Sequence, residues 1–360
     1  MWNYHRYVLI LILIFCTTLV MTLMNMKFLW KIQRVDISAQ RTMYGNNNRN
    51  NIINDINRDV TPEVDPTCPG EFQLDYDIFR FLDRIQHRSL YNSTDDKRIY
   101  NEKIVILTPV SNAGKMLGHY FNLLCSLNYP HELISIGLGE DTSKDETLEL
   151  AVYYQRKLRR HFRRIDVHHF SVDLKGEPMY SRHDKEWQLK RRSHLALARN
   201  QLITYALRDE NYVFWLDVDV KYIPPDIIQH LLSAHADVVA APCYNTQKDG
   251  SLRNYDLNSW QETEESRKYL AQVPKDFLML EGYDHSRRRM LADIKDGGLV
   301  VDLDGVGGCT LLVRAQCHRE GLVFPTSLFQ NHIETEGLAK LAKEMRYTVR
   351  GLPFVTVVHS

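Results

Sequence analysis

The chain has 360 residues, 44% of them hydrophobic, which is enough to bury the core of one large α/β domain with residues left over. Lysine plus arginine and aspartate plus glutamate both number 45, so the formal net charge is zero. This balance does not favour a nucleic-acid-binding protein, which would need a basic stripe with interleaved aromatic side chains. The one dense basic run, Lys190–Arg192, is interpreted as a solvated helix start or a phosphate contact.

An uncharged stretch covers residues 7–26 near the N-terminus. A stretch of about twenty residues is long enough to cross a bilayer as a helix. A cleavable signal peptide is the alternative, but the length and the lack of an A-x-A-like site favour an uncleaved signal anchor. Because Arg6 and Lys27 flank the stretch on both sides, charge bias leaves its orientation undecided.

Residues 27–98 are predicted to form a stem that spaces the body of the protein from the membrane. The segment is rich in asparagine around residues 46–51 and then contains three prolines, so it cannot bury much apolar surface. The triplet Asn92-Ser93-Thr94 is a glycosylation sequon, which fits a lumenal position but also arises by chance.

The cysteines leave two interpretations open. Five of the six lie beyond the predicted anchor and show no zinc-site spacing: Cys68, Cys125, Cys243, Cys309 and Cys317. At least one disulfide in an oxidising lumen is one interpretation, and buried free thiols are the other.

From residue 99 onward, strand and helix signals alternate, which predicts an α/β domain with a mostly parallel central sheet. The predicted strands are 104–107, 133–138, 165–170, 213–216, 238–241, 310–313 and 348–357. The predicted helices are 120–127, 145–162, 186–207, one opened by Pro224-Pro225, and one containing Leu338 and Leu341. Residues 243–300 break this rhythm as a polar and aromatic insertion.

Two carboxylates, Asp217 and Asp219, follow the apolar strand 213–216. Side chains alternate along an extended chain, so both acids are expected on one side while Val218 turns away. Hard oxygen ligands suit Mg²⁺ or Mn²⁺ bridging to a substrate diphosphate, as in the D-x-D pair of nucleotide-sugar transferases. A solvated surface turn is the alternative, and the preceding apolar strand argues against it.

Polar residues also follow the first two predicted strands, where ligands collect in parallel sheets. We expect a nucleotide to contact Thr108, Pro109, Ser111, Glu140 and Asp141. Thr142, Ser143 and Asp145 could equally cap the next helix. On the long helix 186–207, Arg199 and Asn200 lie at the edge of the inward face, and both are expected to contact the nucleotide. Arg199 could reach its diphosphate, or it could lie over the sheet as a surface arginine.

The C-terminal third offers further candidates. Asp304–Gly308 is a glycine-rich turn, which either lets a ligand approach the backbone or only permits a tight turn. In the loop 331–337, His332, Glu334 and Glu336 are candidates for contact with a sugar acceptor, unless Thr335 is an N-cap and the acids only favour the helix start. Asp304 is a fourth candidate for contact with the acceptor. His359 lies beyond an apolar strand and is a reasonable third metal ligand, with a purely structural histidine as the alternative.

Six motifs in order resemble those of the fungal Golgi mannan polymerase mannosyltransferases, glycosyltransferase family 62. They span roughly residues 100–360: Ile104–Pro109, Tyr129–Leu133, Ala198–Asn200, Trp215–Asp219, Asp304–Gly308 and Ile333–Ala339. Cys309 stands where the resemblance implies threonine or another small residue.

The resemblance implies a type II Golgi membrane protein with a cytoplasmic tail (residues 1–6) and a lumenal catalytic domain of GT-A fold (residues 99–360). It implies transfer of mannose from GDP-mannose to α-1,6-mannan on N-glycans, with Mn²⁺, within a complex of mannosyltransferase subunits. Asp217, Asp219 and His359 would be the metal ligands, and Arg199 would share the diphosphate charge.

Donor and product linkage are both α, so configuration is retained, and we expect a front-face displacement rather than an enzymic nucleophile. Two other functions remain open, a non-catalytic scaffold subunit and a GT-A transferase that uses another nucleotide-sugar. Intact carboxylates argue against the scaffold.

Overall fold

The computed structural model describes residues 87–91, 101–170, 185–279 and 287–359. The predicted anchor, nearly all of the predicted stem, and Asn92 and Cys68 lie outside these residues. Within the described ranges, every helix is too short or too polar to cross a membrane.

The core of the fold is an eight-stranded sheet in which four of the seven strand pairings are parallel. Its order is β11 (Val301–Asp302), β13 (Val349–Gly351), β6 (Val238–Ala240), β12 (Thr310–Arg314), β4 (Tyr212–Leu216), β1 (Ile104–Val110), β2 (Ile134–Asp141) and β3 (Arg164–Phe170). β12 runs antiparallel to both of its neighbours. The predicted α/β class with a mostly parallel sheet is confirmed.

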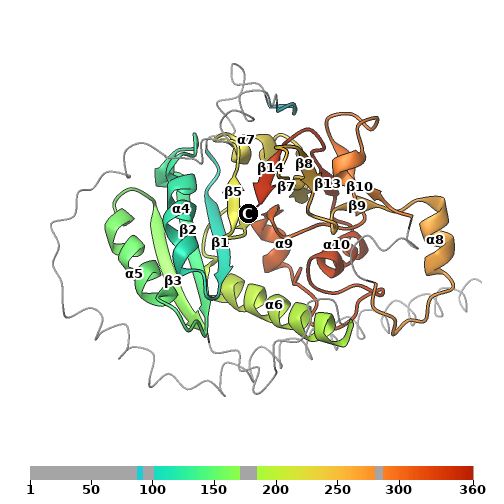
Figure 1. Ribbon diagram of the computed structural model, residues 1–360, viewed down its shortest axis with the longest axis horizontal. Coiled ribbons are helices and arrows are strands. Elements are labelled where there is room, and N and C mark those ends of the chain that lie inside the picture. The colour runs from blue at the N-terminus through green and yellow to red at the C-terminus, as the bar shows by residue number, and fades with distance from the viewer. Residues whose placement is uncertain (1–86, 92–100, 171–184, 280–286, 360) are drawn as a thin grey trace, which may run out of the picture. The chain divides into compact units, whose positions relative to one another are not determined.

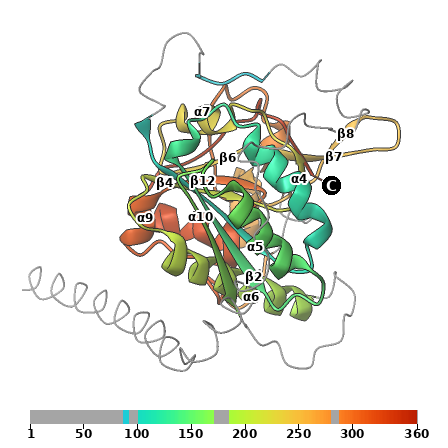
Figure 2. The same cartoon turned by 90° about the vertical axis from the view of Figure 1, so that its left-hand side faces the viewer.

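Helices cover both faces of this sheet (Figures 1 and 2). One face carries α4 (Gly114–Cys125), α5 (Thr147–Leu158) and α7 (Ile227–Leu232), and the other carries α6 (Lys185–Ala206), α9 (Ala315–Arg319) and α10 (Glu334–Glu344). Because strand side chains alternate, Ile106 packs into the first layer and Leu107 into the second. Each fully buried aliphatic side chain contributes about 1.5–3 kcal/mol of burial energy, so the two layers stabilise a rigid platform.

Helix α4 begins earlier than predicted because residues far along the chain cap it. The Ala113 N–H donates to the Thr147 hydroxyl at 2.7 Å, and the Gly114 N–H donates to the Asp145 carboxylate at 3.1 Å. These bonds satisfy N–H groups that a helix start leaves unpaired. Asp145 also accepts from the Thr147 N–H at 3.2 Å, so its predicted capping role at the following helix is only part of what it does.

A second, four-stranded sheet lies beside the first, in the order β5 (Val220–Tyr222), β14 (Val357–His359), β7 (Cys243–Thr246) and β8 (Leu252–Asn254). The single strand predicted over residues 348–357 is therefore wrong: it is two strands, β13 and β14, in different sheets. Pro353 lies between them and cannot donate to a ladder. The predicted insertion 243–300 holds most of the remaining elements: β9 (Trp260–Gln261), α8 (Glu264–Leu270) and β10 (Arg289–Met290).

Candidate functional site

Asp217 and Asp219 lie in the turn that joins β4 to β5, and so they connect the two sheets. The chain turns here rather than staying extended as predicted, and Val218 packs against the core. The Asp217 N–H donates to the Cys309 carbonyl at 3.2 Å, which fixes the start of the turn. The carboxylate side chains are 32% and 34% exposed, so a ligand can reach them.

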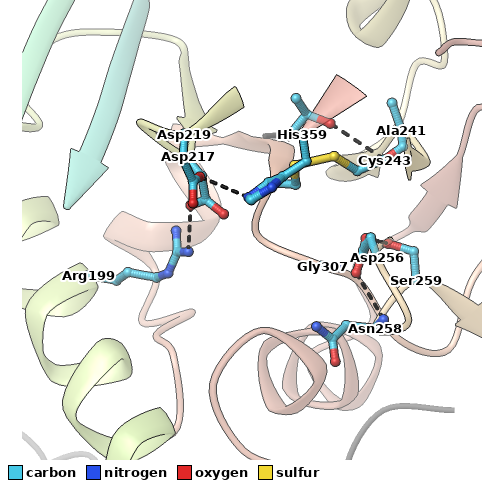
Figure 3. Close-up of a disulfide and its surroundings, with 12 residues drawn as sticks. Arg199, Asp217, Asp219, Ala241, Cys243, Asp256, Asn258, Ser259, Gly307 and His359 are labelled. Atoms are coloured by element: carbon cyan, nitrogen blue, oxygen red, sulfur yellow. Dashed lines mark hydrogen bonds and ion pairs between the residues drawn. A yellow bond between two sulfur atoms is a disulfide. The ribbon is translucent and has the colours of Figure 1, made fainter. Parts of the chain in front are cut away.

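His359 lies beside Asp219 because β14 pairs with β5, the strand that follows the turn. Its Nε2 is 3.0 Å from the Asp219 Oδ1. The imidazole stacks on the Tyr255 ring, with centroids 3.9 Å apart. His359 therefore contacts Asp219, in the same part of the structure as Asp217 (Figure 3).

Arg199 approaches the same turn from α6. Its Nη2 is 3.2 Å from the Asp217 Oδ1, and its Nε donates to the Glu334 Oε1 at 3.1 Å. The residue is only 4% exposed, so the alternative of a surface arginine lying over the sheet is wrong. Its Nη1 is buried and has no hydrogen-bond partner among the described residues. Among the described residues, the donor that faces Asp217 is therefore Nη2, while Nη1 is unpaired inside the protein.

Gly308 makes room for this arginine. A Cβ atom at Gly308 would lie 2.4 Å from the Arg199 Nη2, which is closer than real contacts allow. The guanidinium also lies over the Trp215 ring at 5.2 Å from its centroid. The position of Arg199 is therefore determined from several sides.

Glu334 holds the other side of the guanidinium from an unusual backbone conformation. It is the first residue of α10, with a φ of 57°, a left-handed value that few non-glycine residues adopt. Such strain costs about 1–3 kcal/mol and is concentrated at functional sites. The prediction of Thr335 as N-cap is wrong, since the helix begins at Glu334 and Ile333 is its N-cap.

The electrostatics of the turn favour a bound cation. Burial, with help from Asp219 and Glu334, raises the pKa of Asp217 to about 6, against the opposing charges of Arg199 and His359. A divalent cation would offset this repulsion and keep both carboxylates ionised.

Two carboxylates and an imidazole also form a donor set that Mn²⁺ accepts. Asp217 is directed toward Arg199 and Asp219 toward His359, and no three His, Cys, Asp or Glu side chains in the described ranges are already grouped as a metal cage. The chemistry of the donors fits the ion.

Comparison with known proteins identifies the family. The family model described as Anp1 matches residues 84–328. The mannan polymerase complex subunit MNN9 of Candida albicans is 36% identical over 298 residues, which cover 76% of this chain and 80% of that protein. The mannan polymerase complex subunit mnn9 of Schizosaccharomyces pombe is 36% identical over 273 residues, covering 72% and 80%.

The chain belongs to the Anp1 family. The resemblance to the mannan polymerase mannosyltransferases is thereby confirmed. Among solved structures, a mannosyltransferase from Pyrobaculum calidifontis in complex with GDP-Man and Mn²⁺ aligns with a TM-score of 0.42 at 12% identity, covering 78% of this chain and 61% of that one. Agreement at this level is too loose to support an argument about the site.

Several residues of this Anp1-family chain that were expected to contact a nucleotide have structural roles instead. The Thr108 hydroxyl is fully buried and bonds to the Tyr120 hydroxyl and the Leu216 carbonyl, both at 2.7 Å. The Asn200 amide makes two bonds to the Phe324 backbone, at 2.8 and 2.9 Å. Both predictions are corrected, because these polar atoms already have partners inside the protein.

The end of β2 is also more closed than predicted. Glu140 and Asp141 are 1% and 7% exposed and contact His169 and His194 respectively. At the neighbouring end of β1, Pro109 is half-buried and Ser111 is exposed, so these two keep accessible surface for a nucleotide. Sequence spacing cannot distinguish them, because the histidine partners come from other elements.

Two of the predicted acceptor contacts belong to what we call the buried charge cluster, formed by Arg192, Glu262, Arg288, His332 and Glu336. Glu336 is 0% exposed and accepts from the Trp260 Nε1 at 2.9 Å and the Arg192 Nη1 at 3.3 Å. His332 is equally buried and lies 2.7 Å from the Arg288 Nη2. Neither side chain can touch an acceptor, and Arg192 is neither a solvated residue nor a phosphate contact.

The glycine-rich turn 304–308 makes room for side chains rather than for a ligand. A Cβ at Gly305 would lie 2.3 Å from the Trp260 ring, and one at Gly307 would lie 2.0 Å from the Asp256 carboxylate. The Asp304 carboxylate accepts a hydrogen bond from the Glu262 N–H at 2.7 Å and pairs with Lys343. The prediction that Asp304 contacts the sugar acceptor is therefore corrected.

Sequence reasoning did not identify two features of the site. Tyr255, 46% exposed, lies in the polar insertion and stacks on His359. Cys243 and Cys309, whose state the sequence left open, form a disulfide, while Cys317 is a buried free thiol. The one sequence signal for the disulfide was Cys309, which stands where the family resemblance implies a small residue.

Proposed function

We propose that this chain is a mannosyltransferase of GT-A type that transfers mannose from GDP-mannose to the α-1,6-mannan backbone of N-glycans with retention. Membership of the Anp1 family supports a transferase, and the relatives named above are subunits of mannan polymerase complexes. One observation carries the proposal: three separate parts of the fold bring Asp217, Asp219, Arg199 and His359 to one accessible place.

Each of these residues has a role in holding the donor diphosphate. Asp217, Asp219 and His359 would hold Mn²⁺ or Mg²⁺, which when bound neutralises diphosphate charge and makes GDP a better leaving group. Arg199 supplies a fixed positive charge beside them. Its guanidinium is already oriented by Glu334, Gly308 and Trp215, so little reorganisation is needed as negative charge develops.

Retention follows from a displacement on the front face of the sugar. In this arrangement the acceptor hydroxyl lies near the leaving phosphate and can pass its proton to a phosphate oxygen as the anomeric carbon gains oxocarbenium character. Because His332 and Glu336 are buried and Glu334 positions Arg199, the acceptor is expected to enter beside the exposed ring of Tyr255.

The proposed function includes a location in the Golgi membrane. A signal anchor over residues 7–26, a lumenal stem and residence in the Golgi membrane as a type II protein are expected from the sequence and the resemblance. The subunit names of the relatives support work within a complex of mannosyltransferases.

The proposal is tested by incubating the full chain with a panel of GDP- and UDP-sugars and short α-mannosides, with and without Mn²⁺. We expect transfer from GDP-mannose only with the metal, and its loss in the double variant Asp217→Ala/Asp219→Ala. The control is Asp302→Ala, an aspartate whose side chain is 85% exposed. Undiminished transfer by the double variant would refute the site, no transfer by the unaltered chain would favour a scaffold subunit, and a UDP-sugar donor would correct the substrate.

A further inference from the structure

The disulfide between Cys243 and Cys309 joins two segments that hold opposite sides of the candidate metal site (Figure 3). Both residues are buried, at 0% and 5% exposure, and their Cα atoms are 6.6 Å apart, within the normal range for a disulfide. Residue 243 begins β7 of the small sheet, and residue 309 directly precedes β12 of the large sheet. The bond therefore links the two sheets covalently.

The Cys309 end of the bond holds the carboxylate side. Its carbonyl accepts the Asp217 N–H at 3.2 Å, and the next residue, Thr310, is in register with Leu216 at the end of β4. The preceding residue, Gly308, forms the wall against which the Arg199 guanidinium lies. A shift of Cys309 would therefore move both the first carboxylate and the arginine.

The Cys243 end holds the histidine side. β7 pairs with β14, and Cys243 is in register with Val357, two residues before His359. The Cys243 carbonyl also accepts from the Tyr255 N–H at 2.8 Å, and the Tyr255 ring stacks on His359. The backbone and one face of the histidine ring thus both depend on the position of Cys243.

The strand pairing that links the carboxylate side to the histidine side is irregular next to His359. β14 pairs with β5, which follows the carboxylate turn, but the register shifts between Val358 and His359. A ladder that is disrupted at the ligand itself fixes that ligand less firmly than a regular one. A covalent bond on the other flank of β14 compensates for this.

We propose that the Cys243–Cys309 disulfide is a positioning crosslink, which sets the spacing of His359 from the Asp217–Asp219 turn and so the affinity of the site for a divalent cation. The inference rests on the proposed function, in that it assigns a metal to this site. Reduction by an added dithiol would break the S–S bond, leave two thiols on the protein and oxidise the dithiol to its own disulfide.

The experiment uses the full chain and Mn²⁺ alone, with bound and free metal measured by electron paramagnetic resonance. The test variants are Cys243→Ala/Cys309→Ala and Cys243→Ala/Cys309→Thr, the second placing a small residue that the resemblance implies at position 309. The matched control is Cys317→Ala, which removes a buried cysteine that forms no disulfide. Peptide mapping of the unaltered chain checks the bond, and hydrogen exchange of the Asp217 amide reports on the turn without any metal.

We expect Mn²⁺ to bind about 10–100-fold more weakly to both double variants, the range typical for loss of groups that orient metal ligands. The Asp217 amide should exchange faster in them, and Cys317→Ala should match the unaltered chain in both measurements. A crosslink that only stabilised the fold would lower the melting temperature and leave the Mn²⁺ affinity of the folded protein unchanged.

Two results would overturn the inference and leave the proposed function intact. One is a Mn²⁺ affinity within twofold of the unaltered chain in a folded double variant, and the other is the absence of the 243–309 bond from the unaltered chain. If the double variants fail to fold, the native chain is treated with a dithiol instead, and Cys125→Ala treated in the same way allows for the separate disulfide of Cys125. Failure of the unaltered chain to bind Mn²⁺ would contradict the metal role itself, and with it the inference.

Discussion

Two regions of this molecule combine acids, arginine and histidine, and they differ in how far their acids are exposed to solvent. Around the turn 217–219 the carboxylates are about one-third exposed. In the buried charge cluster, Glu336 and His332 have no exposed surface and bond to neighbouring side chains. The same residue types are therefore accessible to a ligand in one place and specify packing in the other, and the side chains that cover them make the difference.

The largest expected effect is that of Glu336→Ala, which tests whether the buried charge cluster stabilises the fold. The change leaves the Arg192 and Arg288 charges without their buried partner and removes the acceptor of the Trp260 indole N–H, so the free energy of unfolding should fall by about 3–5 kcal/mol. Urea unfolding of the full chain in detergent measures this. The control is Glu344→Ala on the exposed side of the same helix, expected to change stability by no more than about 0.5 kcal/mol. Equal effects would show that the cluster is not a structural element.

Arg199→Lys should act on the rate instead. A lysine cannot bond Glu334 and Asp217 and still present a further planar donor, so kcat for transfer from GDP-mannose should fall about 100-fold, with little change in stability. Steady-state kinetics and a thermal unfolding curve on the same sample separate the two effects. A large loss of stability with kcat unchanged would show that Arg199 has a structural role, like the residues of the buried charge cluster.

The pH dependence of stability sharpens the distinction further. Burial, with help from the neighbouring Arg288, lowers the pKa of His332 to about 2, whereas the unfolded chain titrates near 6.5. Below pH 6.5 the unfolded state therefore binds a proton that the folded state does not, and stability falls as pH falls, by about 1.4 kcal/mol per pH unit for this one group.

Unfolding free energies between pH 6 and 5 should consequently fall less steeply in His332→Gln than in the unaltered chain. Other titrating groups are shared by the two proteins, so the difference in slope isolates His332. Identical slopes would mean that His332 is accessible to protons in the folded state.

The smallest expected effect concerns Tyr255. A stacked ring pair contributes about 0.5–1.5 kcal/mol, so Tyr255→Ala should weaken Mn²⁺ binding through His359 by about 2–10-fold. Tyr255→Phe keeps the stack and serves as the control. Equal affinity in the two variants would show that the ring does not orient the imidazole.

The parts of the fold that sequence predicted are those with long, uniform signals. The apolar runs of β1, β2 and β4 mark buried parallel strands, and the acids that follow β4 mark the site. The second sheet could not be predicted, because β7 and β8 are too short and too polar to show a period.

Which candidates face a ligand depended on partners far away in the sequence. Arg199 is turned toward Asp217 by Glu334, 135 residues later, and by the absence of a side chain at Gly308. His332 and Glu336 look like accessible polar residues of a loop, until Trp260 and Arg288 from the insertion close over them. Helical spacing carries no information about such closure.

The most direct test of the central claim is the affinity of GDP for the full chain, measured by calorimetry with and without Mn²⁺, in the unaltered protein and in Asp217→Ala/Asp219→Ala. If the carboxylate turn holds a cation that carries the diphosphate, Mn²⁺ should tighten GDP binding at least tenfold in the unaltered protein and have no effect in the variant. Equal GDP affinities in the presence of Mn²⁺ for both folded proteins would contradict the account.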